Sequence, residues 1–170
     1  SQRVEELAVI NSVQEGLVSE LHMDAIYEMV GERIRNLFDA QVVAIATFDH
    51  DEKTESFKYI IEKGERYYPD PRPLDKLREH LIESREKVVL NENIEKAFEK
   101  FGMKVVPGTD DPKSAVYVPL TIGDKINSYV SLQNVDREHA FSESDITLLE
   151  TLANSMSVAL ENARLFDEIN

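Results

Sequence analysis

Hydrogen-bonding side chains alternate with apolar ones along two stretches in the second half of this sequence. Tyr117 stands between two valines, and Tyr129, Ser131 and Gln133 are separated by single apolar residues. Because neighbouring side chains of a strand point to opposite faces, these polar residues share one face while the apolar residues between them face a core. Polar groups set among apolar surface are what a pocket for a small organic molecule requires. The chemistry that these residues indicate is binding.

A second interpretation of the same residues stays open. Tyrosine is common in protein cores when its hydroxyl group finds a partner. The aromatic side chains on this face could therefore form a second, small core and leave no space for a ligand.

Catalysis and metal binding find little support in the sequence. Cysteine is absent, which excludes thiolate catalysis, thiolate zinc sites, iron–sulfur ligation and thioether attachment of a chromophore. No phosphate-binding glycine loop, serine-nucleophile elbow or zinc-binding helix motif occurs. The histidines have no second ligand at metal-binding spacing, so we predict no metal site; they are His22, His50, His80 and His139. We expect a protein that is not an enzyme.

The charge balance narrows the range of partners. Lysine and arginine total 19 against 33 aspartate and glutamate residues, which gives a formal net charge of −14. So acidic a chain repels the phosphates of nucleic acids and of anionic membranes, and we expect neither as a partner. No run approaches the ~20 apolar residues that span a bilayer, and Ser1–Glu6 has no apolar signal core, so we predict a cytoplasmic protein.

The length of 170 residues and the 42% hydrophobic content suit one folded domain. We expect residues 1–170 to form that single domain. The chain begins without Met and reaches Asn170 inside a helical pattern, so we expect it to be excised from a longer polypeptide.

Two charged patterns resemble sites but have plainer interpretations. Asp49–Thr54 begins like a calcium loop with acidic residues two apart, but it lacks the turn glycine, and we predict a solvated hairpin turn. Arg72, Lys76 and Arg78 form a local basic cluster, which we interpret as an exposed surface and not as an anion site.

The first part of the chain predicts two helices followed by paired strands. Apolar residues recur at three- and four-residue steps from Val4 to Leu21 and from Ile26 to Phe38. Val42–Phe48 is rich in β-branched residues, and Phe57, Tyr59 and Ile61 alternate with polar residues. Residues 63–113 are less regular, with short elements between non-helical stretches. These comprise the stretches Tyr67–Pro73 and Val106–Pro112, short helices at Leu74–Leu81 and Ile94–Phe101, and a short strand at Val88–Leu90.

The second half predicts a hairpin and a long helix. Ala115–Ile122 and Ile126–Val135 read as strands joined by a turn at Gly123-Asp124. A helix begins at Ser142, which can cap it together with Asp145.

The apolar residues of this last helix step three, four, three and four positions, the spacing of a coiled-coil seam. They are Leu149, Leu152, Met156, Ala159 and Ala163. This seam predicts a homodimer through the terminal helices. The alternative is that the seam covers the sheet within one monomer, because helices that face a core use similar spacing.

Four segments resemble those of a GAF domain, a family of sensory and regulatory modules of signalling proteins related to PAS domains. The strand Ser114–Leu120 ends in Val-Pro-Leu, and the hairpin continues through Val130–Asn134. Ala140–Asp145 is similar to the family's Phe-Ser-x-x-Asp entry to its last helix, and Ala159–Leu165 to the exit from it. The resemblance covers about the whole chain.

The resemblance implies an α+β fold. A central antiparallel sheet would carry the N- and C-terminal helices on one face, and short helices and loops over a ligand pocket on the other. It adds aromatic and cationic residues of the connections to the pocket. The complete set of expected ligand-binding residues is Tyr59, Tyr67, Arg72, Phe98, Phe101, Tyr117, Tyr129, Ser131 and Gln133.

Departures from the family's motifs limit the ligands that the resemblance implies. Members that bind cyclic nucleotides match here at Asn134, Phe141 and Asp145, but Val135 and Ile146 replace a lysine and a glutamate. Cyclic nucleotides are therefore disfavoured, and without cysteine neither a covalent bilin nor reduction of free methionine sulfoxide is available. We predict no cofactor. Two functions remain: a domain that senses an unidentified small molecule and signals to an output domain, or a connector that dimerises without a ligand.

Overall fold

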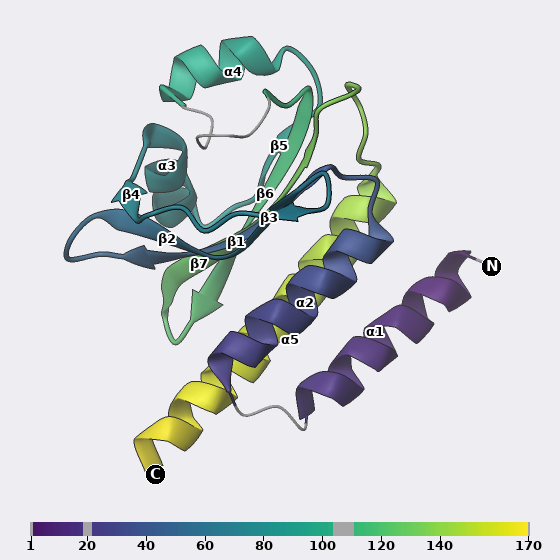
Figure 1. Ribbon diagram of the computed structural model, residues 1–170, viewed down its shortest axis with the longest axis vertical. Coiled ribbons are helices and arrows are strands. Elements are labelled where there is room, and N and C mark those ends of the chain that lie inside the picture. The colour runs from purple at the N-terminus through teal and green to yellow at the C-terminus, as the bar shows by residue number, and fades with distance from the viewer. Residues whose placement is uncertain (1, 19–21, 104–110, 170) are drawn as a thin grey trace.

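The computed structural model describes residues 2–18, 22–103 and 111–169 and has an antiparallel sheet with helices on both faces (Figure 1). In the described part of the chain the sheet has seven strands, in the order β3-β2-β1-β7-β6-β5, with β4 pairing to β2. Their bounds are β1 Val42–Asp49, β2 Thr54–Glu62, β3 Glu65–Arg66, β4 Arg72–Pro73, β5 Val88–Leu90, β6 Ser114–Ile122 and β7 Lys125–Asn134. The predicted α+β class and central antiparallel sheet are confirmed.

The helices divide between the two faces (Figure 1). Their bounds are α1 Gln2–Val18, α2 Met23–Leu37, α3 Lys76–Ser84, α4 Ile94–Phe101 and α5 Glu143–Ile169. α2 packs on β1 and β2 and α5 packs on β6, whereas α1 packs on α5 and α2. α3 lies against β6 and β7 on the other side. The predicted helix end at Leu21 and the part of the non-helical stretch from Val106 to residue 110 lie outside the described residues.

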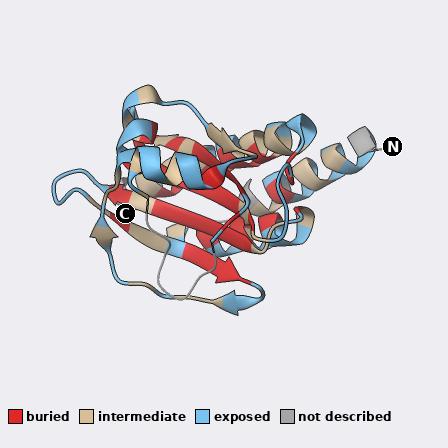
Figure 2. Ribbon diagram, turned by 90° about the horizontal axis from the view of Figure 1, so that it is seen from above, coloured by how far each residue is buried: buried red, intermediate tan, exposed pale blue. Residues whose placement is uncertain are grey.

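The sheet separates two apolar layers, and Figure 2 shows the buried residues concentrated in its strands. The layer on the α2/α5 face includes Val116, Val118 and Leu120 of β6 and Val130 and Leu132 of β7. The layer on the α3/α4 face includes Tyr117 and Tyr129 together with Leu77 and Leu81 of α3. The alternation that the sequence predicted for these two strands is therefore the one observed.

The alternation predicted for the second strand is wrong. A bulge shifts the register between Ile45 and Ala46 of β1, so that Ile45 pairs with Tyr59 but Ala46 pairs with Phe57. The extra residue in β2 is Lys58, and it turns the two aromatic residues to opposite faces. Phe57 packs in the α3/α4 layer, whereas Tyr59 belongs to the α2/α5 layer.

α2 approaches the sheet closely at this point. A Cβ atom added to Gly31 would lie 2.5 Å from Cγ of Tyr59, well inside any real contact. Because glycine has no side chain, the helix backbone can rest directly on the tyrosine ring. The Tyr59 hydroxyl group then reaches past the helix and donates a hydrogen bond of 2.9 Å to Glu32 Oε2.

α5 begins as the sequence predicted. The backbone N–H of Asp145 donates to Ser142 Oγ (3.1 Å), and the N–H of Ser142 donates to Asp145 Oδ2 (3.0 Å). This reciprocal pair is a capping box, which satisfies two backbone donors that the first turn leaves without helical partners.

The apolar seam of α5 lies inside the monomer. Leu149, Leu152, Met156, Ala159 and Ala163 are each no more than 7% exposed and pack in the α2/α5 layer. The alternative that the seam covers the sheet is therefore the observed arrangement, because these five side chains are buried within one chain. The exposed large apolar residues of α5 are instead Val158, Leu165 and Phe166.

We expect Leu152→Glu and Met156→Glu each to unfold the domain and not merely to dissociate a dimer, because each places a charge in a core position that is at most 1% exposed. Circular dichroism with chemical denaturation measures this loss, and light scattering reports the oligomeric state. Val158→Glu, on the exposed side of the same helix, is the control and should leave the free energy of unfolding within about 0.5 kcal/mol. A Leu152→Glu variant that keeps its sheet signal at native stability contradicts the assignment.

Candidate functional site

The α3/α4 face of the sheet holds a buried group of charged and polar side chains. At its centre the Glu55 carboxylate of β2, 1% exposed, accepts hydrogen bonds from Arg72 Nε (2.8 Å) and from the Tyr129 hydroxyl group. Arg78 Nε lies 3.3 Å from the same carboxylate. We call Glu55, Arg72, Arg78 and Tyr129 the polar cluster. Its members come from β2, β4, α3 and β7, so it joins four elements.

Arg78 is held in place on every side. Asp75 caps α3 by accepting the backbone N–H of Arg78 (2.9 Å), and its other oxygen accepts from Arg78 Nη1 (2.8 Å). Nη2 donates to the Tyr129 hydroxyl oxygen at 3.0 Å. Burial alone would lower the pKa of Arg78, but Tyr129, Glu55, Tyr117 and Asp75 outweigh burial and raise it well above its ordinary value. The guanidinium therefore stays charged, and it joins α3 to β2 and β7 through these partners.

Arg72 differs from Arg78 in that one of its nitrogen atoms has no partner. Nε donates to Glu55, and the guanidinium lies 5.4 Å from the ring centroid of Phe57. Nη2 is buried and makes no hydrogen bond. The side chain as a whole keeps 20% of its surface exposed. Arg72 is thus a donor at the edge of the cluster that still lacks an acceptor.

Tyr117 and Gln133 extend the polar group toward β6. The Gln133 side-chain amide donates to the Tyr117 hydroxyl oxygen at 3.2 Å, and the Tyr117 and Tyr129 rings lie 6.1 Å apart. Both tyrosines are fully buried. Burial raises the pKa of the Tyr117 hydroxyl and raises that of Tyr129 well above its ordinary value, so both are neutral hydroxyl groups.

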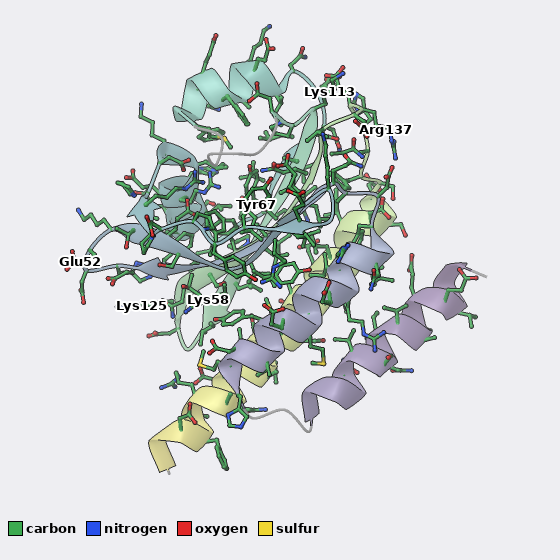
Figure 3. The ribbon with its side chains drawn as sticks, viewed as in Figure 1. Glu52, Lys58, Tyr67, Lys113, Lys125 and Arg137 are labelled. Carbon is green, nitrogen blue, oxygen red and sulfur yellow. The ribbon has the colours of Figure 1, made fainter. Side chains whose placement is uncertain are left out.

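The structure brings most of the expected ligand-binding residues to one face. Phe98 and Phe101 of α4 are partly buried in the same apolar layer as Tyr117 and Tyr129. Tyr67 is half-buried, and Figure 3 places it on the α3/α4 side of the sheet. Tyr59 is the exception, because the bulge in β2 turns it toward α2. Ser131 and Gln133 share their face with Tyr129 by alternation along β7.

Sequence reasoning missed the centre of the cluster. Glu55 is two residues from Phe57 in the same strand, so alternation could have placed it on an inner face. Arg78 was interpreted as exposed, yet it is 4% exposed, and that interpretation is wrong. Its position between Leu77 and Leu81 on one helical face was the available signal.

The described residues contain neither a cluster of metal-ligating side chains nor a helix able to cross a membrane. No three His, Asp or Glu side chains converge there to hold a metal ion. No helix within 2–18, 22–103 and 111–169 combines the length and the apolar character that crossing a membrane requires. His50 instead lies 2.9 Å through Nε2 from the carbonyl oxygen of Ile126.

Comparison with models of protein families identifies the family of this chain. The family model of the GAF domain matches residues 20–161. The chain belongs to the GAF domain family. GAF domains are generally sensory or regulatory modules of signalling proteins, and they are generally non-catalytic. Among functionally curated proteins none matches this sequence.

Solved structures agree with the family assignment. The GAF domain of a phosphoenolpyruvate-protein phosphotransferase from Coxiella burnetii is similar with a TM-score of 0.77, 14% identity and 99% coverage of both chains. A free methionine-R-sulfoxide reductase from Neisseria meningitidis is similar with a TM-score of 0.75 and 14% sequence identity. The match covers 98% of this GAF domain and 94% of the reductase. The GAF domain of a phosphoenolpyruvate-protein phosphotransferase from Acinetobacter is similar with a TM-score of 0.71 and 16% sequence identity, and the match covers 95% of each chain. At such low identity the likeness shows the fold alone.

We expect Glu55→Gln to destabilise the domain by about 3 kcal/mol, because it leaves the buried guanidinium of Arg78 and the partly exposed one of Arg72 without their shared carboxylate. Glu150→Gln is the matched control, since Glu150 pairs with Lys87 at 3.1 Å where both side chains are well exposed. That substitution should cost less than about 1 kcal/mol. Denaturant unfolding measures both, and equal losses for the two variants contradict a central role for Glu55.

We expect the domain to lose stability as the pH rises above 10. Burial raises the pKa of Tyr27 to about 12 and also raises the pKa values of Tyr59, Tyr117 and Tyr129. A folded pKa above the unfolded value of 10 stabilises the protein fully below pH 10, and this stabilisation declines as the pH passes through the folded value. Because the chain lacks tryptophan, phenolate absorbance reports the titration directly. Ionisation of these four tyrosines near pH 10 in the folded protein contradicts the prediction.

Proposed function

We propose that this GAF domain is a sensory or regulatory domain that binds a small cytoplasmic molecule and passes its occupancy through the terminal helices to an output domain. The site is the α3/α4 face around the polar cluster. The observation that carries the proposal is the buried, unpartnered Nη2 of Arg72. A buried donor without an acceptor costs about 1–3 kcal/mol, and an oxygen atom of a ligand can supply the missing acceptor.

The surroundings of Arg72 suit a small organic ligand. Phe57 lies beneath the guanidinium, and Phe98 and Phe101 line the same layer. Such a mixture of aromatic walls and a few fixed polar groups is typical of small-molecule sites. Because Arg78, Glu55 and Gln133 already have partners, Arg72 is the polar side chain that we assign to ligand contact.

We propose that the domain binds its ligand without transforming it. The chain has no cysteine, and the carboxylate and hydroxyl groups of the polar cluster bond to one another. A general base needs access to the proton that it removes, and Glu55 is 1% exposed. We likewise propose that the domain acts without a cofactor, a nucleic acid or a membrane as partner.

The second candidate is a connector that dimerises without a ligand. The complete burial of Tyr117 and Tyr129 favours it, because side chains packed in this way form a second core. Its dimer contact would use the outer side of the helical layer, where Val158, Leu165, Val4 and Leu7 are exposed. A groove of about 540 Å³ between Gln14 of α1 and residues 151–162 of α5 lies on that side.

A thermal-melting screen separates the two functions. The probes are nucleotides, free amino acids and small carboxylic acids, each added in large excess. A ligand at about 100 times its Kd stabilises the folded state by ~2.7 kcal/mol, which raises the melting temperature by roughly 5–10 °C for a domain of this size. Arg72→Gln should abolish the shift, and Lys87→Gln, which breaks an exposed ion pair, should retain it.

A flat response of the folded domain to all three classes of probe contradicts the sensor and favours the connector. A shift that Arg72→Gln leaves intact places the ligand elsewhere and contradicts the proposed site.

A further inference from the structure

The segment that joins β3 to β4 connects two distant parts of the fold. β3 pairs with Ile61 and Glu62 at one end of β2, and β4 pairs with Thr54 and Glu55 at the other. We call residues 66–72 the strap. It runs along the edge of the sheet from Arg66 to Arg72, and each of these arginines binds a carboxylate of a different element.

Arg66 fastens the first end of the strap to α2. Its Nη1 and Nη2 donate to the two carboxylate oxygens of Glu28 at 2.8 and 2.7 Å. The guanidinium lies 4.2 Å from the ring centroid of Tyr59. The hydrogen bonds from Arg66 lower the pKa of Glu28, so the pair is ionised at neutral pH. A two-pronged pair stacked on a ring fixes orientation as well as distance.

One face of α2 carries both the residue that pairs with Arg66 and the two residues that contact Tyr59. Glu28, Gly31 and Glu32 lie three and four positions apart, so they share one side of the helix. Gly31 rests on the Tyr59 ring, and Glu32 accepts the Tyr59 hydroxyl group. Arg66 thus closes a contact that positions α2 on the sheet.

Arg72 fastens the other end of the strap to the polar cluster through Glu55. Between the two ends stand Tyr67-Tyr68-Pro69-Asp70-Pro71, and the backbone N–H of Tyr67 donates to the carbonyl oxygen of Ile60 at 3.1 Å. Proline fixes one backbone dihedral and favours extended chain before it. Two prolines in five residues therefore restrict the backbone of the strap and favour an extended conformation.

We propose that the strap is a mechanical link through which the polar cluster controls the packing of α2. A ligand that takes Arg72 from Glu55 displaces the strap and loosens the clamp of Arg66 on Glu28. The inference rests on the proposed function, because Arg72 belongs to the ligand site. It adds a route by which occupancy on the α3/α4 face reaches the helical layer on the opposite face.

Hydrogen exchange measured by mass spectrometry tests the link without a ligand. Arg72→Gln removes the contact with Glu55 and touches nothing on α2. We expect amide exchange in Met23–Leu37 to rise roughly 3- to 10-fold, as for the loss of one charge-assisted contact, while exchange in α5 stays unchanged. Arg66→Gln should produce the same rise, and the double variant should exceed neither. Lys87→Gln is the control that breaks an ion pair away from the strap.

A second pair of variants tests the stiffness of the strap itself. Pro69→Gly/Pro71→Gly keeps both arginines but makes the segment flexible. In this background Arg72→Gln should no longer change exchange in α2. Arg72→Lys serves if Arg72→Gln fails to fold, because it keeps the charge and loses the Nε contact.

Three results overturn the link: unchanged α2 exchange in the Arg72 variants, an equal rise in α2 and α5, or an additive double variant. None of them depends on a ligand. If no probe raises the melting temperature but α2 exchange rises in the Arg72 variants, the sensor function is contradicted and the link is supported. If a probe raises the melting temperature but α2 exchange is unchanged, the sensor function is supported and the link is contradicted.

Discussion

One buried carboxylate holds the connections of this domain to its sheet. Glu55 binds Arg72 of β4, lies beside Arg78 of α3 and accepts the hydroxyl group of Tyr129 of β7. A carboxylate removed from water loses several kcal/mol of solvation, so its partners must all be present for the arrangement to be stable. Because these partners come from separate segments, the position of Glu55 dictates how the α3/α4 face is covered.

The two faces of the sheet consequently differ in kind. The α2/α5 face is closed mainly by apolar side chains, beside which Arg66 pairs with Glu28 and Tyr59 with Glu32. Its closest approach depends on the absence of a side chain at Gly31. The α3/α4 face mixes aromatic rings with charges, and there Arg72 keeps an unused donor. The strap between Arg66 and Arg72 passes from one face to the other.

Periodicity predicted the face on which each side chain lies where the strands are regular, and it failed at the bulge in β2. Tyr117 and Tyr129 lie on the expected face, because β6 and β7 alternate without interruption through these positions. The predicted face of Tyr59 is wrong, because a bulge shifts the register of β2 and no residue type in the sequence indicates this bulge. The spacing of apolar residues in α5 predicts one apolar face, but the same spacing suits a helix packed on a sheet and a helix packed on a second chain. The sequence predicted an exposed Arg78, because a charged side chain is buried only where partners from other elements compensate its charge, and those partners, Glu55 and Tyr129, are far away in the sequence.

The sequence by itself determined the order of the main helices and strands and the capping box of α5, because these depend on local propensity, and its short motifs indicated the family and with it the α+β class. It did not indicate the short strands β3 and β4. It also determined which chemistries are absent, since a chain without cysteine has no thiolate. Only the tertiary structure decided that Glu55 and Arg78 meet, that Tyr59 turns to α2, and that the α5 seam is buried. These are contacts between residues far apart in the chain, and their energies exist only after the sheet has brought the segments together.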